Sequence, residues 1–235
     1  MKIYVVNIEN INEDMFNHYT YNSFLSEYTL SKARKFNNFK DTVRTTIGEL
    51  LLRYLLEKHG CLNSLSATIL RNLYGKPYLE DTTPNLHFNI SHSGEWVVCI
   101  IDNNPVGIDI EMICEIDVKN IISLFHPFEA NKINEAPDMI NYFYNTWTVK
   151  ESVLKLTGKG LSLPLKSFYI EFLEDGPFVN CDSSFPDDTN FHVKMYDFAK
   201  LYKLAVCSIN KNFPSSVVKI NVMDILDYFK DKQKG

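Results

Sequence analysis

PVGIDIEMI, residues 105–113, alternates like a short buried strand, but one of its faces carries two acids. Side chains on a strand point alternately to opposite faces, so the three aliphatic residues Val106, Ile108 and Ile110 share one face. Asp109 and Glu111 share the other face with a glycine. Two carboxylates on one buried face repel each other and lose solvation unless something positive lies near them. The stretch therefore predicts a strand whose acids need a positive partner.

The bulk composition limits the classes of protein to which this chain can belong. It has 235 residues, 45% of them hydrophobic, and a formal net charge of -5 at pH 7. The length suits one large domain or two smaller ones, and the mild negative charge does not indicate a nucleic-acid-binding surface. The N-terminal stretch MKIYVVNIEN lacks the features of a signal peptide, and no apolar run approaches the roughly 20 residues of a membrane helix. Five scattered cysteines without a CxxC pair favour reduced thiols. We therefore expect a cytoplasmic protein that binds neither nucleic acid nor membranes.

The first half of the chain is predicted to contain strands, helices and a turn. A strand is expected over residues 2–8, a helical stretch over 12–27, and a long helix that begins near Ser31 and has Gly60 as its C-cap. NLYGKPYL (72–79) predicts a turn, because Gly-Lys-Pro continues neither a helix nor a central strand. LHFNISHSGEWVVCIID (86–102) and PVGIDIEMI predict a hairpin of two strands around the Asn-Asn pair at 103–104.

The second half repeats this organisation. A long helix is expected over 141–160, followed by strands in SFYIEFL (167–173), FHVKMYDF (191–198) and LYKLAVCSI (201–209). ELLLR (49–53) and ESVLK (151–155) each place a glutamate four residues before a basic residue, late in a long helix. The pattern predicts a duplicated α+β unit with halves 1–103 and 104–235. No long Gly/Ser/Pro linker separates the halves, so we expect them to pack together with a ligand-binding cleft between them.

Two further stretches carry groups that suit phosphate chemistry. WTVKESVLKLTGKGLSLPL (147–165) places Glu151 and Lys155 one turn apart on a largely apolar helix, although such a pair alone is usually a solvated surface ion pair. NISHSGEWVV (89–98) places two hydroxyls, an imidazole and a glycine at the end of a strand. Such a set can donate several hydrogen bonds to phosphate oxygens.

The donor types indicate a divalent cation. Carboxylates at Asp109, Glu111 and Glu151 suit Mg²⁺ or Mn²⁺ rather than zinc, because no His/Cys set has metal-ligand spacing. Carboxylates, a divalent ion and Lys or His donors together form a typical phosphoryl-transfer site. The sequence contains neither GxxxxGK[ST] nor GxGxxG after a strand, which excludes the P-loop and Rossmann nucleotide sites.

The ordered set FNISHSGEW, GIDIE and WTVKESVLKLTGKGLSLPL resembles the 4'-phosphopantetheinyl transferases of the surfactin-synthetase-activating (Sfp) type. KARKF, YGKP and YKLAVCS resemble the same family, and the likeness runs from MKIY to LAVC. It implies an α+β fold of two similar halves related by a pseudo-twofold axis, with the active site in the cleft between them. It also implies transfer of the phosphopantetheine arm of coenzyme A to a serine of an apo acyl, peptidyl or aryl carrier protein, with release of adenosine 3',5'-bisphosphate. Both halves lie on one chain, which favours a monomer over the trimeric holo-acyl-carrier-protein synthase class.

The resemblance implies a role for each matched residue. Asp109, Glu111 and Glu151 would face Mg²⁺, and Glu151 would also act as base toward the serine hydroxyl. Lys155 and His92 would complete the catalytic set by contacting phosphate. Contacts with coenzyme A are implied for the following matched residues: Lys32, Arg44, Gly75, Lys76, Pro77, Ser91, His92 and Lys155.

Some features depart from the family pattern or leave alternatives. Thr29 stands where a further basic residue is common, and Glu95 follows SHSG where an acid is unexpected near a phosphate, so both bear on coenzyme A affinity. Phe125 or Phe128 of LFHPF (124–128) is a candidate apolar anchor for the carrier protein, with core packing as the alternative. Two rival functions remain, namely a different Mg²⁺-dependent phosphotransferase and a carrier-protein-binding module without catalysis.

Overall fold

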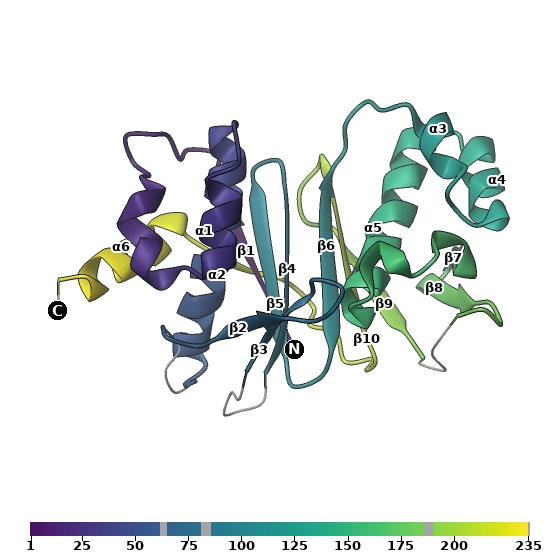
Figure 1. Ribbon diagram of the computed structural model, residues 1–235. Helices are drawn as coiled ribbons and strands as arrows, with labels where there is room; N and C mark the ends of the chain where they lie inside the picture. Colours follow the sequence, from purple (N-terminus) through teal and green to yellow (C-terminus); the bar gives the residue numbers. More distant parts are fainter. Residues whose placement is uncertain (62–64, 81–85, 186–189, 235) are drawn as a thin grey trace.

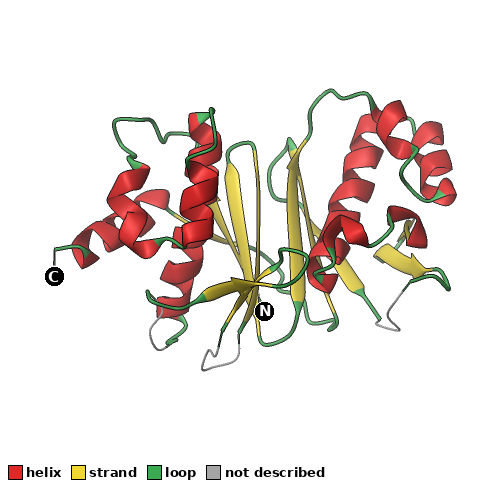
Figure 2. Cartoon of the chain, in the orientation of Figure 1, coloured by secondary structure: helices red, strands yellow, loops and turns green. Residues whose placement is uncertain are grey.

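Two β-sheets stand side by side in the middle of the molecule, and helices cover their outer sides (Figures 1 and 2). The computed structural model describes residues 1–61, 65–80, 86–185 and 190–234, which form an α+β fold. The first sheet has the order β11-β1-β5-β4, with β1 Lys2–Asn7, β4 His87–Ser93, β5 Trp96–Asp102 and β11 Val218–Ile220. The second has the order β6-β10-β9, with β6 Val106–Met112, β9 His192–Tyr196 and β10 Tyr202–Ser208.

The helices of the first half are shorter at their N-terminal side than predicted. The prediction of a helix over 12–27 is wrong, because asparagine side chains fold this stretch into turns; Asn17, for example, accepts from the Tyr19 N–H. Only the 3₁₀ helix η1 (His18–Phe24) and the start of α1 (Glu27–Ala33) fall there. The long helix α2 (Phe39–Lys58) begins at Phe39 rather than near Ser31, because Asn38 caps it. Its end is as predicted, with Gly60 following at a positive φ of 73°.

The second half follows the predicted order closely. The long helix α5 (Met139–Thr157) ends at Gly158, which adopts the left-handed conformation. The predicted strands correspond to β7 (Phe168–Leu173), β9 and β10, so these predictions are confirmed. The remaining elements were not predicted: α3 Val118–Ile122, α4 Pro127–Glu135, η2 Gly160–Ser162, η3 Leu165–Ser167, β8 Gly176–Cys181 and α6 Val222–Lys232. The predicted turn at YGKP is confirmed, and it joins two short strands that were not predicted, β2 (Ile69–Arg71) and β3 (Pro77–Leu79).

The predicted hairpin around residues 103–104 is wrong in its pairing. Residues 86–102 themselves form the β4–β5 hairpin, and β6 pairs with β10 instead of β5. The two sheets meet where β6 runs beside β4, and side chains replace the backbone hydrogen bonds of a normal ladder. Asn89 Oδ1, Ser91 Oγ and Ser93 Oγ accept from the N–H groups of β6 residues 108, 110 and 112 at 2.9, 3.3 and 3.0 Å. We call this row of three contacts the seam.

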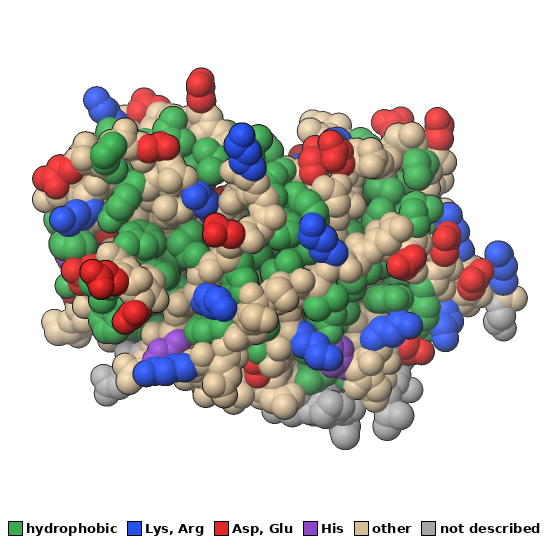
Figure 3. Space-filling model, turned by 180° about the vertical axis from the view of Figure 1, so that it is seen from behind, with side chains coloured by type: hydrophobic (Ala, Val, Ile, Leu, Met, Phe, Trp, Pro, Cys, Tyr) green, Lys and Arg blue, Asp and Glu red, His purple; other side chains and the backbone are tan. Residues whose placement is uncertain are grey.

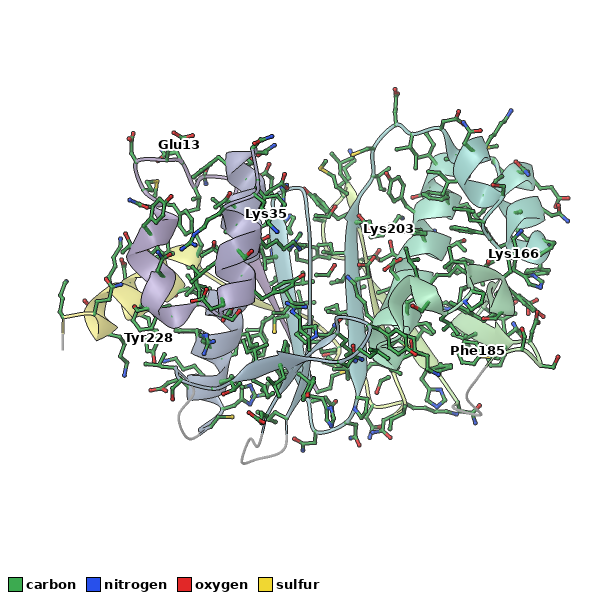
Figure 4. All side chains as sticks on the ribbon, viewed as in Figure 1. Glu13, Lys35, Lys166, Phe185, Lys203 and Tyr228 are labelled. Atoms are coloured by element: carbon green, nitrogen blue, oxygen red, sulfur yellow. The ribbon has the colours of Figure 1, made fainter. Side chains whose placement is uncertain are left out.

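The core lies in three layers that match the alternation of the strands. Ile3 and Val5 of β1 pack against Ile108 and Ile110 of β6 between the two sheets. The other face of the first sheet packs on α2, and the other face of the second packs on α5. Side chains from both sheets fill the interior (Figure 4).

The C-terminal end of the chain returns to the first half. β11 pairs in parallel with β1, and Phe229 of α6 packs into the core around α2. A division after residue 103 therefore does not give two continuous halves, because residues 218–232 pack on the N-terminal side. The pseudo-twofold relation of the halves stays a prediction.

The surface shows no extended patch of one charge on the face seen in Figure 3, where acidic and basic side chains are interspersed. Among the described helices, none combines the length and the apolar character needed to cross a membrane. All five cysteines are free, with Cys114 and Cys181 exposed.

Candidate active site

The acidic face of β6 lies against α5 at close range. Gly107, the first residue of that face, approaches the backbone of Ser152 and Leu156 so closely that a Cβ would collide with both. This contact needs a glycine, and it brings the next two residues of the face, Asp109 and Glu111, opposite the polar side of α5. The predicted alternation of PVGIDIEMI is therefore confirmed.

Asp109 has found its positive partner in Lys155. Lys155 Nζ donates to Asp109 Oδ1 at 2.6 Å and to Ser91 Oγ at 2.8 Å. Ser91 Oγ in turn donates to Asp109 Oδ1 at 2.9 Å. Asp109 is only 2% exposed, and burial raises its pKa above the ordinary value although Lys155 and Ser91 oppose this shift. The network thus joins the seam, β6 and α5 at one carboxylate.

The other two carboxylates, Glu111 and Glu151, lie near enough to Asp109 for its charge to affect their pKa values. Glu111 accepts from Trp147 Nε1 at 3.2 Å and from Ser93 Oγ at 3.1 Å, and burial together with Asp109 raises its pKa. Burial raises the pKa of Glu151 to about 7, and the charges of Asp109 and Glu111 add to this shift. A carboxylate with a pKa near 7 can take up and release protons at neutral pH.

These groups line a cavity of about 420 Å³, within the size range of small-molecule sites. Its walls come from α1, α2, β2, β3, β4, β6 and α5, so both sheets and both long helices contribute. The cavity brings together eight of the predicted site residues: Lys32, Pro77, Ser91, His92, Asp109, Glu111, Glu151 and Lys155.

Three predicted coenzyme A contacts do not line this cavity. Arg44 pairs with Asp41 and donates to the carbonyl oxygen of Gly94 at 2.5 Å. Gly75 lies at the tip of the β2–β3 turn with φ 89°. Lys76 points away from the cavity wall, since its Nζ donates to the carbonyl oxygens of Leu156 at 2.9 Å and Val106 at 3.3 Å.

His92 and the two departures from the family pattern are placed as follows. Burial lowers the pKa of His92 to about 4, and the neighbouring cations Lys32, Lys155 and Arg44 add to the effect, so its imidazole is neutral at pH 7. Thr29 is buried in the cavity wall. Glu95 is not among the lining residues; it pairs with Lys40 at 2.6 Å.

Sequence reasoning missed two features of the cavity. Arg71 lines it with its guanidinium stacked 3.4 Å from the ring centre of Tyr28, and burial lowers the Arg71 pKa. The position of Arg71 just before the NLYGKPYL turn was the one feature of the sequence that could have indicated its place in the cavity wall. Glu49 of ELLLR also reaches the cavity wall, where it accepts from Arg53 Nη2 at 2.7 Å.

The carboxylates fit a divalent cation by donor type rather than by a finished geometry. Asp109 Oδ2 is buried and has no hydrogen-bond partner among the described residues, so the lone pairs of this oxygen are available to a cation. Burial is the main reason that the pKa values of Glu111 and Glu151 are raised, and the like charges that add to the shift are ones that a cation would neutralise. Within the described residues, however, no group of three or more His, Cys, Asp or Glu side chains is already assembled as a metal site.

The predicted docking role of Phe125 is wrong. Phe125 is 1% exposed and stacks on Phe143 and Trp147, so it belongs to the core beneath α5. Phe128 is half-buried against Tyr169. The exposed apolar side chain of LFHPF is instead Leu124, at 59%.

Comparison with known proteins shows the family to which the chain belongs. Residues 105–207 match the 4'-phosphopantetheinyl transferase superfamily, and residues 15–103 match the N-terminal region of 4'-phosphopantetheinyl transferases. The chain is 35% identical to the 4'-phosphopantetheinyl transferase Sfp of Bacillus subtilis (strain 168), over 87% of this chain and 91% of Sfp. It is 36% identical to the 4'-phosphopantetheinyl transferase gsp of Aneurinibacillus migulanus, over 84% and 82% of the two chains. A holo-(acyl-carrier-protein) synthase of Bacillus anthracis, solved in complex with CoA, matches 44% of this chain and 92% of its own with 15% identity and a TM-score of 0.37. Because its identity to Sfp extends over most of both chains, the chain belongs to the Sfp-type 4'-phosphopantetheinyl transferases.

Proposed function

We propose that this protein transfers the 4'-phosphopantetheine arm of coenzyme A to a serine of an apo carrier protein and releases adenosine 3',5'-bisphosphate. The observation that carries this proposal is one cavity whose wall combines the carboxylates of Asp109, Glu111 and Glu151 with three cations, Lys155, Lys32 and Arg71. Such a cavity can bind a phosphate-rich donor at one part of its wall and carry out proton transfer at another.

The side chains divide this work by their charge and position. Lys32 and Arg71 bind phosphate groups of coenzyme A, because both are cations on the N-terminal side of the cavity. The neutral imidazole of His92 donates a hydrogen bond to a phosphate oxygen, whereas the one hydroxyl proton of Ser91 is donated to Asp109. Lys155 stabilises the negative charge that develops as the diphosphate bond breaks.

Glu151 serves as the base that accepts the proton of the incoming serine hydroxyl. Glu151 lines the same cavity as Lys155 and His92, and burial raises the pKa of its carboxyl, which makes it a better proton acceptor. Asp109 and Glu111 would hold Mg²⁺ or Mn²⁺ together with Glu151. When bound, that cation supplies neutralising charge for the diphosphate.

One experiment separates this function from its two rivals. The purified chain is incubated with coenzyme A, Mg²⁺ and an apo carrier protein, and the intact mass of the carrier is measured. We expect the carrier to gain one phosphopantetheine arm for each adenosine 3',5'-bisphosphate released. Cleavage of coenzyme A without a mass gain would indicate a different phosphotransferase, and carrier binding without either change would indicate a non-catalytic module.

A matched pair of variants ties the activity to the cavity. Asp109→Asn removes the buried carboxylate that joins Lys155 and Ser91, so we expect loading of the carrier to stop. Asp231→Asn makes the same chemical change at a side chain that is 78% exposed on α6, so we expect loading at the unchanged rate.

A further inference from the structure

The C-terminal end of α5 is held by side chains from the other half of the chain. The last carbonyl groups of a helix have no partner within the helix. Here the carbonyl oxygen of Leu156 accepts from Lys76 Nζ at 2.9 Å, and that of Gly158 accepts from Asn72 Nδ2 at 2.8 Å. A cation at this end is also favoured by the helix dipole. The turn between β2 and β3 therefore caps the helix that carries Glu151.

The same ammonium ties α5 to β6. Lys76 Nζ donates to the carbonyl oxygen of Val106, the first residue of β6, at 3.3 Å. β6 carries Asp109 and Glu111, and α5 carries Glu151. One half-buried lysine thus bridges the two elements from which Asp109, Glu111 and Glu151 project. Burial lowers its pKa to about 8, in keeping with an ammonium removed from solvent.

Hydrogen bonds within the turn hold it together, and the residues that flank it line the cavity. Asn72 Oδ1 accepts from the N–H groups of Tyr74 at 3.0 Å and Lys76 at 2.9 Å. Arg71 Nη1 donates to the carbonyl oxygen of Gly75 at 2.6 Å. Arg71 and Pro77, which flank the turn, line the cavity.

The contact between the turn and the helix leaves no free space. A Cβ at Gly158 would lie 2.9 Å from Lys76 Cδ and 3.0 Å from Asn72 Nδ2, closer than ordinary van der Waals contact. A shift of the turn must therefore be accompanied by a shift of the end of α5.

We propose that Asn72 and Lys76 are positioning residues, which lock the β2–β3 turn to the end of α5 and so hold Glu151 and Lys155 in place opposite the carboxylates of β6. The inference rests on the proposed function. It assigns to the Lys76 side chain a role different from direct contact with coenzyme A, since its ammonium is already engaged with two backbone carbonyl groups.

Two variants and one control test this role by steady-state kinetics with coenzyme A and an apo carrier protein. Lys76→Met keeps an unbranched side chain but removes the ammonium. Asn72→Asp keeps the oxygen that accepts inside the turn but replaces the donor to Gly158. We expect kcat to fall about tenfold or more in each, with KM for coenzyme A changed by less than about twofold, because displaced catalytic groups slow the chemical step. Lys166→Met alters an exposed lysine away from the cavity (Figure 4) and should change neither constant.

The outcomes are distinct. A rise in KM for coenzyme A at unchanged kcat would mean that Lys76 contacts the nucleotide, and unchanged constants would mean that the cap is irrelevant to the reaction; either result overturns the proposal. Circular dichroism at the assay temperature checks folding, and if Lys76→Met does not fold, Asn72→Asp decides alone. Failure of the wild-type chain to load any carrier would refute the proposed function as well, whereas loading by wild type with unaltered variants refutes only the positioning role.

Discussion

Gly107→Ala tests whether the close approach of β6 and α5 sets the geometry of the site. The added Cβ would lie 2.5 Å from Leu156 N and closer still to the carbonyl oxygen of Ser152. Ordinary contacts of this kind are 3.4–4 Å, so α5 would have to retreat by about 1 Å or more. The opposing atoms are helix backbone, which cannot rotate away as a flexible side chain would.

The expected cost follows from this geometry. Overpacking a core costs about 1–3 kcal/mol, and a collision with several backbone atoms of α5 belongs at the upper end, so we expect a loss of about 3 kcal/mol in the free energy of unfolding. The retreat also carries Lys155 away from Asp109, from which it now lies 2.6 Å. A displacement of about 1 Å can cost 100-fold in rate, so we expect carrier loading to fall by about that factor.

Urea unfolding and carrier loading, measured on the same preparations, check both effects. Gly48→Ala, in the middle of α2, provides the stability control, because its Cβ would meet only side chains, Ile90 at 3.3 Å and Val97 at 3.9 Å. Alanine is favoured over glycine in a helix by about 1 kcal/mol, which offsets the close contact. We therefore expect the free energy of unfolding of this variant to differ from that of the wild type by no more than about 1 kcal/mol. If Gly107→Ala loses less than about 1 kcal/mol and keeps full activity, the packing argument is wrong.

Four further results are expected. Asp109→Ala should abolish turnover with little change in stability, because burial already disfavours the ionised carboxylate; near-normal turnover in Mg²⁺ would contradict the metal assignment. The pKa of His92 is lowered from 6.5 to about 4, so the folded chain favours the neutral imidazole. The contribution of His92 to the free energy of unfolding should therefore be full above pH 6.5 and fall as the pH drops toward 4. In His92→Gln, urea unfolding across this window should show a weaker dependence of stability on pH. Arg53→Met should cost about 3–5 kcal/mol in urea unfolding, because it leaves Glu49 buried without its cation, and a loss below about 1 kcal/mol would show that water replaces the pair. Light scattering after size exclusion should give the mass of a monomer, whereas a trimer would contradict the two-half interpretation.

The features of the site that could be predicted from the sequence are those that depend on the local spacing of side chains along a strand or a helix. The period of two in PVGIDIEMI separates Ile108 and Ile110, which pack between the sheets, from Asp109 and Glu111, which face α5. The helical spacing of Glu151 and Lys155 likewise placed both in the cavity wall. These features depend on short-range geometry, which a single sequence specifies.

The features that could not be predicted depend on contacts distant in the chain. The pairing of β6 with β10 and its seam with β4 arise because polar side chains on β4 accept from the edge of β6. Asn89, Ser91 and Ser93 alternate along β4, and this pattern was the available signal, but it reads equally well as a solvent-facing strand. The placement of Lys76 at the end of α5 spans 80 residues of sequence, and no local pattern encodes it.

The two stretches ELLLR and ESVLK show how one spacing yields two kinds of site. In α2, Glu49 and Arg53 close on each other, each 5% exposed, and Ser26 adds donors to the carboxylate through its N–H and hydroxyl at 2.7 Å. All of the charge is matched, and the pair serves the packing of α1 on α2. In α5 the lysine reaches across to Asp109 on β6 instead, and burial together with the charge of Asp109 raises the pKa of Glu151, one turn earlier, to about 7. The i,i+4 pair therefore serves only packing where its ion pair closes within the helix, and its glutamate becomes available for proton transfer where a second carboxylate engages the lysine.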